Sequence, residues 1–111
     1  MKIVIKATKT YEKDIFKILS LKEREDMEYE IASNPLAWPV IAGSGGVRKA
    51  RFSRGDMGKR SGGRVCYLYL QVHSVLYMLK AYTKNDQEDL LEKEKKQIKK
   101  IVEQIREMLG G

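Results

Sequence analysis

The sequence contains one cysteine, Cys66, and one histidine, His73, among its 111 residues. A single cysteine excludes an internal disulfide, and the two residues together supply too few soft ligands for a structural zinc site, which usually needs four. The longest uninterrupted apolar run, Val65–Leu70, is six residues long, far short of the ~20 that a membrane-spanning helix requires. The N-terminal stretch Lys2–Lys6 has no apolar core long enough for a signal peptide. We therefore expect one cytoplasmic domain over residues 1–111, with no membrane partner, no metal and no cofactor.

Negative charge is scarce in the middle of the chain. Residues 43–84 carry nine lysines and arginines but a single acidic residue, Asp56, for a net charge of +8, whereas the two flanking segments are balanced to within one charge. A solvated surface normally intersperses the two signs. One-sided charge over about forty residues favours a polyanionic partner, either a phosphate backbone or an acidic protein, and nucleic acid is the stronger interpretation.

Hydrophobic periodicity predicts an α+β domain. Helix caps are indicated at Thr8 or Thr10, at Ser20 with Glu23, and at Asp89 with Glu92. The expected elements, in chain order, are a strand at 2–7, helices at 11–19 and 21–33, strands at 47–52, 64–71 and 75–84, and a long C-terminal helix ending near 109. The simplest assembly is an antiparallel sheet of about four strands with the helices against one face.

Cationic side chains are expected on the open face of this sheet. Alternation places Ala50 and Phe52 in the core and Lys49 and Arg51 opposite them. Adjacent strands add further polar side chains to the same face: Arg64, Lys80, Tyr82 and Lys84. Such a cluster can hold an RNA phosphate and stabilise the negative charge that develops when the neighbouring 2′-OH attacks in line. Tyr82 can transfer a proton if the cations lower its pKa, or stack on a base. Charge alone leaves open whether the cluster cleaves RNA or only binds it.

The other candidate motifs have plainer explanations. Gly58-Lys59-Arg60 lacks the Ser or Thr that follows the lysine of a phosphate-binding loop, and Gly43–Gly46 precedes a strand rather than a helix. Cys66 lies between large apolar residues in a predicted strand, which is typical of a buried structural cysteine. His73 lies in a predicted hairpin turn, away from the basic loop, and is expected to be exposed and not catalytic.

Three segments resemble, in order and spacing, the RelE/HigB toxins of bacterial type II toxin–antitoxin modules: Gly43–Phe52, Gly58–Tyr69 and Leu79–Leu90. With the flanking helices the resemblance covers roughly residues 25–105. It implies a small RelE-like α+β fold with two N-terminal helices and a C-terminal helix. It implies an activity, cleavage of messenger RNA in the ribosomal A site without a metal. It also implies a cognate antitoxin, which is commonly a helix-turn-helix protein that also binds operator DNA.

The resemblance also implies roles for individual residues. The catalytic positions it indicates are Lys49, Arg51, Arg64, Tyr82 and Lys84. It also places Asn85 beside Lys84 at the end of the last strand. From the concentration of positive charge we expect further contacts with RNA or the ribosome at Arg48, Arg54, Lys59, Arg60 and Lys80. Some members of the wider family keep a catalytic tyrosine in the C-terminal helix, which has none here, so Tyr82 or Lys84 would substitute and the general base stays open. The alternative is a non-catalytic nucleic-acid-binding protein or a ParE-like gyrase poison, although ParE toxins tend to lack such dense strand cations.

Overall fold

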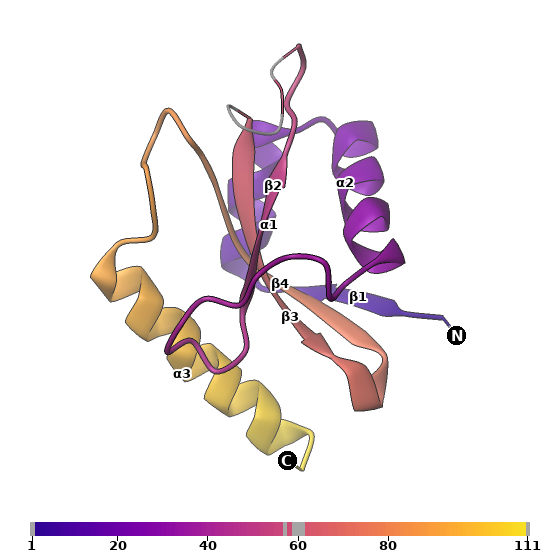
Figure 1. The fold of residues 1–111 in the computed structure, drawn as a ribbon, viewed down its shortest axis with the longest axis vertical. Coiled ribbons are helices and arrows are strands. Elements are labelled where there is room, and N and C mark those ends of the chain that lie inside the picture. Colours follow the sequence, from indigo (N-terminus) through magenta and orange to yellow (C-terminus); the bar gives the residue numbers. More distant parts are fainter. Residues whose placement is uncertain (1, 57, 59–61, 111) are drawn as a thin grey trace.

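The computed structural model describes residues 2–56, 58 and 62–110, which form one four-stranded sheet and three α-helices (Figure 1). The strands are β1 (Val4–Ala7), β2 (Arg48–Phe52), β3 (Gly63–Leu70) and β4 (Val75–Thr83). The helices are α1 (Lys9–Ile18), α2 (Leu21–Ser33) and α3 (Glu92–Met108), and a short 3-10 helix, η1 (Gln71–His73), joins β3 to β4. The α+β class and the order of elements predicted from the sequence are confirmed.

The sheet is mixed, with the strand order β1-β4-β3-β2. β3 runs antiparallel to both β2 and β4, as predicted. β1 instead runs parallel to β4, with Val4 opposite Val75. The expectation of a wholly antiparallel sheet is wrong for β1, because that strand joins the sheet beside a strand far along the chain and no hairpin fixes its direction.

Helices cover both faces of the sheet, not one face as expected (Figure 1). α1 and α2 pack through Tyr11, Ile15 and Met27 on one face, and α3 packs through Ile98 and Val102 on the other. The reason is visible in β3, which is apolar on both faces and therefore needs a covering layer on each side. In the part of the chain that the structure describes, no helix has the length and apolar character needed to cross a membrane.

A β-bulge in β4 sets which side chains reach each face. The pairing with β3 skips Leu79, so the simple alternation of side chains breaks there. Met78 and Ala81 both pack against α1 and α2, whereas Leu79 and Tyr82 both pack on the α3 side. Regular alternation along the strand predicts that Leu79 and Ala81 share one core face, and the bulge makes that prediction wrong.

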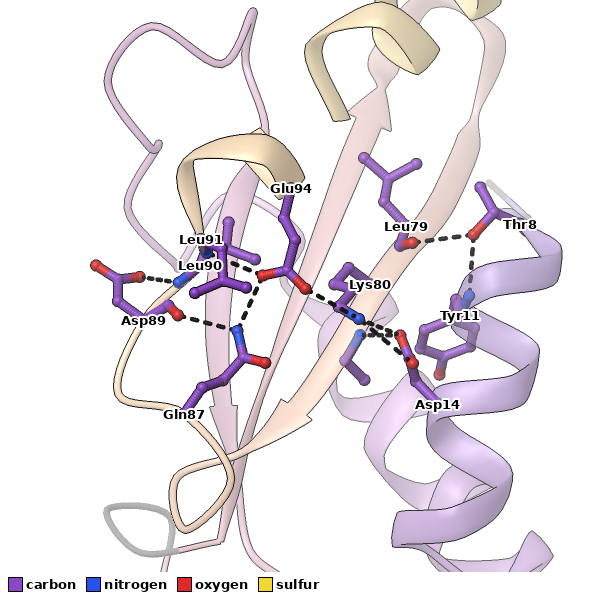
Figure 2. Close-up of polar contacts among 11 residues, drawn as sticks. Thr8, Tyr11, Asp14, Leu79, Lys80, Gln87, Asp89, Leu90, Leu91 and Glu94 are labelled. Atoms are coloured by element: carbon purple, nitrogen blue, oxygen red, sulfur yellow. Dashed lines mark hydrogen bonds and ion pairs between the residues drawn. The ribbon is translucent and has the colours of Figure 1, made fainter. Parts of the chain in front are cut away.

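Thr8, the N-cap residue of α1, and Asp14 within α1 bond to β4 beyond the end of β1. The Thr8 hydroxyl donates to the Leu79 carbonyl at 2.9 Å and accepts from the Tyr11 N–H at 3.1 Å, so one residue caps α1 and holds it to the sheet (Figure 2). The Asp14 carboxylate accepts the Ala81 N–H at 3.1 Å. These contacts satisfy backbone groups that an edge strand would otherwise leave unpaired.

Candidate nucleic-acid interface

Five of the predicted site residues stand in two neighbouring rows across β2, β3 and β4. Arg51 lies opposite Arg64, which lies opposite Tyr82. Lys49 and Lys80 stand in the next row, on either side of β3. Cross-strand neighbours on one face lie about 5 Å apart, so the rows bring these residues together as the sequence predicts. We call these five residues the strand cluster.

Two glycines shape the chain beside the cluster. A Cβ atom at Gly62 would collide with the carbonyl oxygen of Phe52, and one at Gly63 would collide with the Phe52 ring. This close approach brings the chain back beside β2, so that β3 begins with Gly63 opposite Phe52 and Arg64 lies opposite Arg51. Lys59 and Arg60, the loop cations predicted to contact RNA, lie outside the described residues.

Arg51 and Arg64 differ sharply in exposure although they are cross-strand neighbours. Arg51 is exposed, and its guanidinium carbon lies 5.8 Å from the centre of the Trp38 ring, a cation–π distance. Arg64 is only 7% exposed, and its guanidinium donates to the carbonyl of Gly63 at 3.0 Å. The expectation that Arg64 stands clear of the packed interior is therefore wrong. Because β3 has a neighbouring strand on each side, Arg64 is enclosed even though it is only the second residue of the strand.

Lys49 is paired with a carboxylate from the segment that connects β4 to α3. Its ammonium lies 3.1 Å from Oδ1 of Asp89, and the lysine side chain is 32% exposed. The same carboxylate oxygen accepts the Leu90 N–H at 2.8 Å. The Leu90 N–H and then Lys49 hold the pKa of Asp89 below its usual value, against the opposing effect of partial burial. The lysine expected on an open face therefore already faces a negative charge.

Lys80 lies between carboxylates from two helices (Figure 2). Its ammonium is 3.4 Å from Asp14 of α1 and 3.3 Å from Glu94 of α3, and its side chain is only 18% exposed. Glu94 also accepts the Leu91 N–H and the Gln87 side-chain amide, each at 2.9 Å. The expectation that Lys80 projects freely toward RNA is wrong, because its charge is used to join both helical layers to β4.

Tyr82 is buried on the α3 side of the sheet, with 4% of its surface exposed. Its hydroxyl has no hydrogen-bond partner among the described residues. Desolvation raises the pKa of Tyr82, the nearby Asp89 carboxylate adds to the rise, and the opposing attraction of Arg64 is smaller. The suggestion that surrounding cations lower this pKa is therefore wrong. At neutral pH the phenol keeps its proton and is suited to donating a hydrogen bond rather than to acting as a base.

The remaining predicted contacts occupy three separate places. Lys84 and Asn85 are exposed in the turn that follows β4, next to the end of the strand cluster. Arg48 lies on the opposite face of β2, where its guanidinium donates to the Trp38 carbonyl at 2.6 Å and so holds the connector that precedes the strand. Arg54 is half-buried just beyond the end of β2. Of these residues, Lys84 and Asn85 stand where they can extend the strand cluster.

Sequence reasoning missed the carboxylates that face the cluster. Asp89 was expected to cap α3 together with Glu92, but Leu91 is the N-cap residue and Glu94 accepts its N–H. Leucine has no side-chain acceptor, so the first turn of α3 depends on the glutamate at its third position. That glutamate was a signal available in the sequence. The approach of Asp14 from α1 had no local signal, because it depends on how the helix packs.

The structure agrees with the plain interpretations of Cys66 and His73. Cys66 is fully buried, and desolvation raises the pKa of its thiol to about 12. His73 is exposed in η1, at the end of β3 remote from the cluster. Across residues 2–56, 58 and 62–110, no three His, Cys, Asp or Glu side chains gather as a metal site requires.

Comparison with solved structures relates this fold to that of the E. coli toxin RelE. An arginine-to-alanine double mutant of that toxin in the free state matches with a TM-score of 0.55 and 16% identity, over 79% of this chain and 90% of the toxin chain. The isolated E. coli RelE toxin matches with a TM-score of 0.54 and 16% identity, over 89% and 98% of the two chains. No family model matches the chain. The RelE-like fold expected from the sequence resemblance is confirmed.

Proposed function

We propose that this protein is a RelE/HigB-type toxin of a bacterial toxin–antitoxin module, which stops translation by cutting messenger RNA on the ribosome. The observation that carries the proposal is the strand cluster on a RelE-like sheet, with Arg51 and Arg64 in one row and Lys84 beside its end. The net charge of +8 over residues 43–84 supports a polyanionic substrate. The toxin acts in the cytoplasm and is neutralised by a cognate antitoxin of the helix-turn-helix type.

The proposed reaction is a transesterification within the RNA chain. The 2′-oxygen attacks the adjacent phosphorus, and the bond between phosphorus and the 5′-oxygen breaks. A base takes the proton of the 2′-OH, and an acid gives a proton to the departing 5′-oxygen. The products are a 2′,3′-cyclic phosphate and a 5′-hydroxyl. Fixed cations stabilise the negative charge that develops on the phosphate oxygens, and this scheme requires no metal.

The residues of the strand cluster and of the turn after β4 have roles that follow from their exposure. Arg51 is exposed and meets the scissile phosphate first, and Arg64 lies behind it as a second guanidinium. Lys84, exposed at the end of β4, stabilises the leaving oxygen or gives it a proton. Tyr82 is buried and keeps its proton, so it serves as a hydrogen-bond donor and not as the base. Asn85 extends the surface toward the RNA backbone.

Lys49 can bind the RNA phosphate only if the phosphate replaces the Asp89 carboxylate beside its ammonium. In the structure the Asp89 carboxylate stands beside its ammonium, where a phosphate would stand in the RNA complex. The exposed ion pair is weak in water, so a phosphate held by several cations can displace the carboxylate. Lys80, held by two carboxylates, stays with the structural framework.

A reconstituted cleavage assay tests the proposal. Purified protein is mixed with ribosomes programmed with a reporter message, and primer extension maps the new ends. We expect cuts within translated codons that leave a 2′,3′-cyclic phosphate and a 5′-hydroxyl, and that persist when transition metals are chelated at constant Mg²⁺. Arg51→Ala should reduce cutting by about 100-fold, whereas Lys13→Ala, on the exposed surface of α1, should cut like the wild type.

Three outcomes would contradict the proposal. If the folded protein makes no cuts, the proposed nuclease activity is wrong. Equal cutting of ribosome-free RNA would remove the dependence on the ribosome. Inhibition of gyrase supercoiling without RNA cleavage would favour the gyrase-poisoning alternative that shares this fold.

A further inference from the structure

A pocket of about 290 Å³ lies between the loop that precedes β2 and the first turns of α3. Figure 1 shows this loop running alongside α3, on the side of the sheet that the helix covers. The interior of the pocket is lined mainly by three aliphatic side chains, the half-buried Ile41 and the buried Leu90 and Ile98, with the buried Ser44 beside them. The pocket contains no residue of the strand cluster.

The loop wall of the pocket is held in place by hydrogen bonds. The Ser44 hydroxyl donates to the Ile41 carbonyl at 2.6 Å and accepts the Val47 N–H at 3.0 Å. The guanidinium of Arg106 donates to the Gly45 carbonyl at 2.8 Å and so ties the loop to α3. The pocket is therefore formed before any partner binds, which lowers the ordering cost of binding.

The rim of the pocket is cationic. It carries three lysines from one flank of α3: Lys95, Lys96 and Lys99. Lys96 and Lys99 are exposed and make no ion pair within the described part of the chain, and Lys95 makes only a long contact of 3.5 Å with Glu92. Lys95 and Lys99 are four residues apart and therefore point to the same side of the helix. An aliphatic interior under these ammonium groups calls for a partner that is both apolar and acidic.

The lining favours an acidic peptide over nucleic acid. RNA-binding pockets usually offer aromatic rings or arginine planes on which bases stack. Among the described residues that line this pocket there is neither an aromatic ring nor an arginine. An aliphatic side chain flanked by Asp or Glu matches both the interior and the lysines.

We propose that this pocket docks an acidic segment of a partner protein. One aliphatic side chain of the segment fills the space over Leu90 and Ile98, and its carboxylates pair with the lysines of the rim. The inference goes beyond the proposed function, because it concerns a second surface and does not depend on RNA cleavage.

A selection with defined probes tests the docking site. A phage library of dodecapeptides is selected on the folded protein, and the enriched peptide is titrated by fluorescence anisotropy. We expect enrichment of acidic peptides with one aliphatic residue. Lys95→Glu with Lys99→Glu should weaken binding by about tenfold or more. The matched pair Lys13→Glu with Lys17→Glu, also four residues apart on an exposed helix surface, should bind like the wild type.

A second variant tests the pocket without changing charge. Ala42 is exposed and lines the pocket, so Ala42→Trp should fill the space and weaken the peptide by a similar factor. The proposal is overturned if no acidic peptide is enriched, or if binding survives both the charge reversal and Ala42→Trp. It is also overturned if a labelled RNA dodecamer, rather than the peptide, depends on Lys95 and Lys99.

The two proposals fail separately. Arg51→Ala should lose RNA cleavage and keep the affinity for the peptide. If no peptide docks but cleavage is intact, only the proposed docking site is wrong. If the peptide docks but no RNA is cut, only the proposed nuclease activity is wrong.

Discussion

The ammonium of Lys49 and the carboxylate of Asp89 lie 3.1 Å apart, although 40 positions separate them in the chain. The two side chains are 32% and 58% exposed, so solvent screens the pair and its contribution to stability is under about 1 kcal/mol. In the proposed nuclease the same ammonium meets a phosphate. The Asp89 carboxylate therefore competes with the RNA phosphate for the Lys49 ammonium. The stronger the Lys49–Asp89 ion pair is, the more it weakens RNA binding.

The variant Asp89→Asn should bind RNA more tightly. The amide oxygen can still accept the Leu90 N–H, so the chain entering α3 should keep its path, while Lys49 loses its negative neighbour. Removing a pair worth under about 1 kcal/mol should raise the affinity up to about fivefold. The measurement is fluorescence anisotropy of a short single-stranded RNA at low salt. Asp86→Asn, an exposed acid in the preceding turn, is the control for net charge. Equal gains for both variants, or none for Asp89→Asn, would speak against competition.

The Glu94 carboxylate should make stability depend on pH. Its side chain is 14% exposed, and burial opposes its ionisation. The Leu91 N–H, the Gln87 amide and Lys80 outweigh burial, so the pKa of Glu94 lies below its usual value. A lowered carboxyl pKa adds stability above the usual value, and this is lost as pH falls through the native-state pKa.

The variant Glu94→Gln should therefore lose more unfolding free energy, relative to the wild type at the same pH, at about pH 7 than at about pH 3. We expect a cost of about 1–3 kcal/mol at neutral pH, the usual range for a charge-assisted hydrogen bond, and a much smaller difference in acid. Urea unfolding followed by circular dichroism measures both values. Glu103→Gln, exposed on α3, should change stability by less than about 0.5 kcal/mol. A cost for Glu94→Gln that does not change with pH would refute the assignment.

Arg51 and Arg64 should separate activity from stability. Arg51 is exposed, so Arg51→Ala should lower the free energy of unfolding by no more than about 1 kcal/mol while reducing cleavage by about 100-fold. Arg64 is enclosed and bonded to the Gly63 carbonyl, so Arg64→Ala should also cost about 1–3 kcal/mol of stability. Arg64→Lys keeps the charge without the planar fork and should fold but cleave poorly. Cleavage rates and thermal melting temperatures, measured on the same preparations, separate the effects on activity from those on stability. Cleavage at the wild-type rate by Arg51→Ala would exclude Arg51 from the site.

Local patterns in the sequence predicted much of the fold. Ser20 and Glu23 form the predicted capping box at the start of α2, because a cap depends only on residues three apart. Ala50 and Phe52 are buried as the alternation along β2 predicted. The apolar run Val65–Leu70 also fits the central place of β3 in the sheet, since a strand that is apolar on both faces has to be covered on both.

The sequence could not predict contacts that depend on packing between distant segments. The bulge at Leu79 reverses the alternation of side chains in β4, and no local residue marks it. The ion pairs of Lys80 with Asp14 and Glu94 require α1 and α3 to lie on opposite faces of the sheet. Residue types alone therefore located the cations but not the carboxylates that neutralise part of them.

The dependence of RNA binding on salt should report how many cations are available. If all nine lysines and arginines of residues 43–84 neutralised phosphates of a single strand, affinity would fall several-thousand-fold between about 50 and 200 mM salt. The structure commits Lys80 to two carboxylates and Arg48 to the connector, and pairs Lys49 with Asp89. The six cations that remain of the nine, Arg51 and Lys84 among them, instead predict a fall of roughly 300-fold.

Anisotropy titrations of a short single-stranded RNA over this salt range give the slope directly. Asp89→Asn should steepen the slope by about 0.7, one additional phosphate contact, because it releases Lys49. A wild-type fall of several-thousand-fold would show that RNA displaces every internal ion pair, and a flat response would remove the cationic face from RNA binding. An unchanged slope in Asp89→Asn, with a normal circular dichroism spectrum, would place Lys49 outside the RNA site and leave its pairing with Asp89 a purely structural contact.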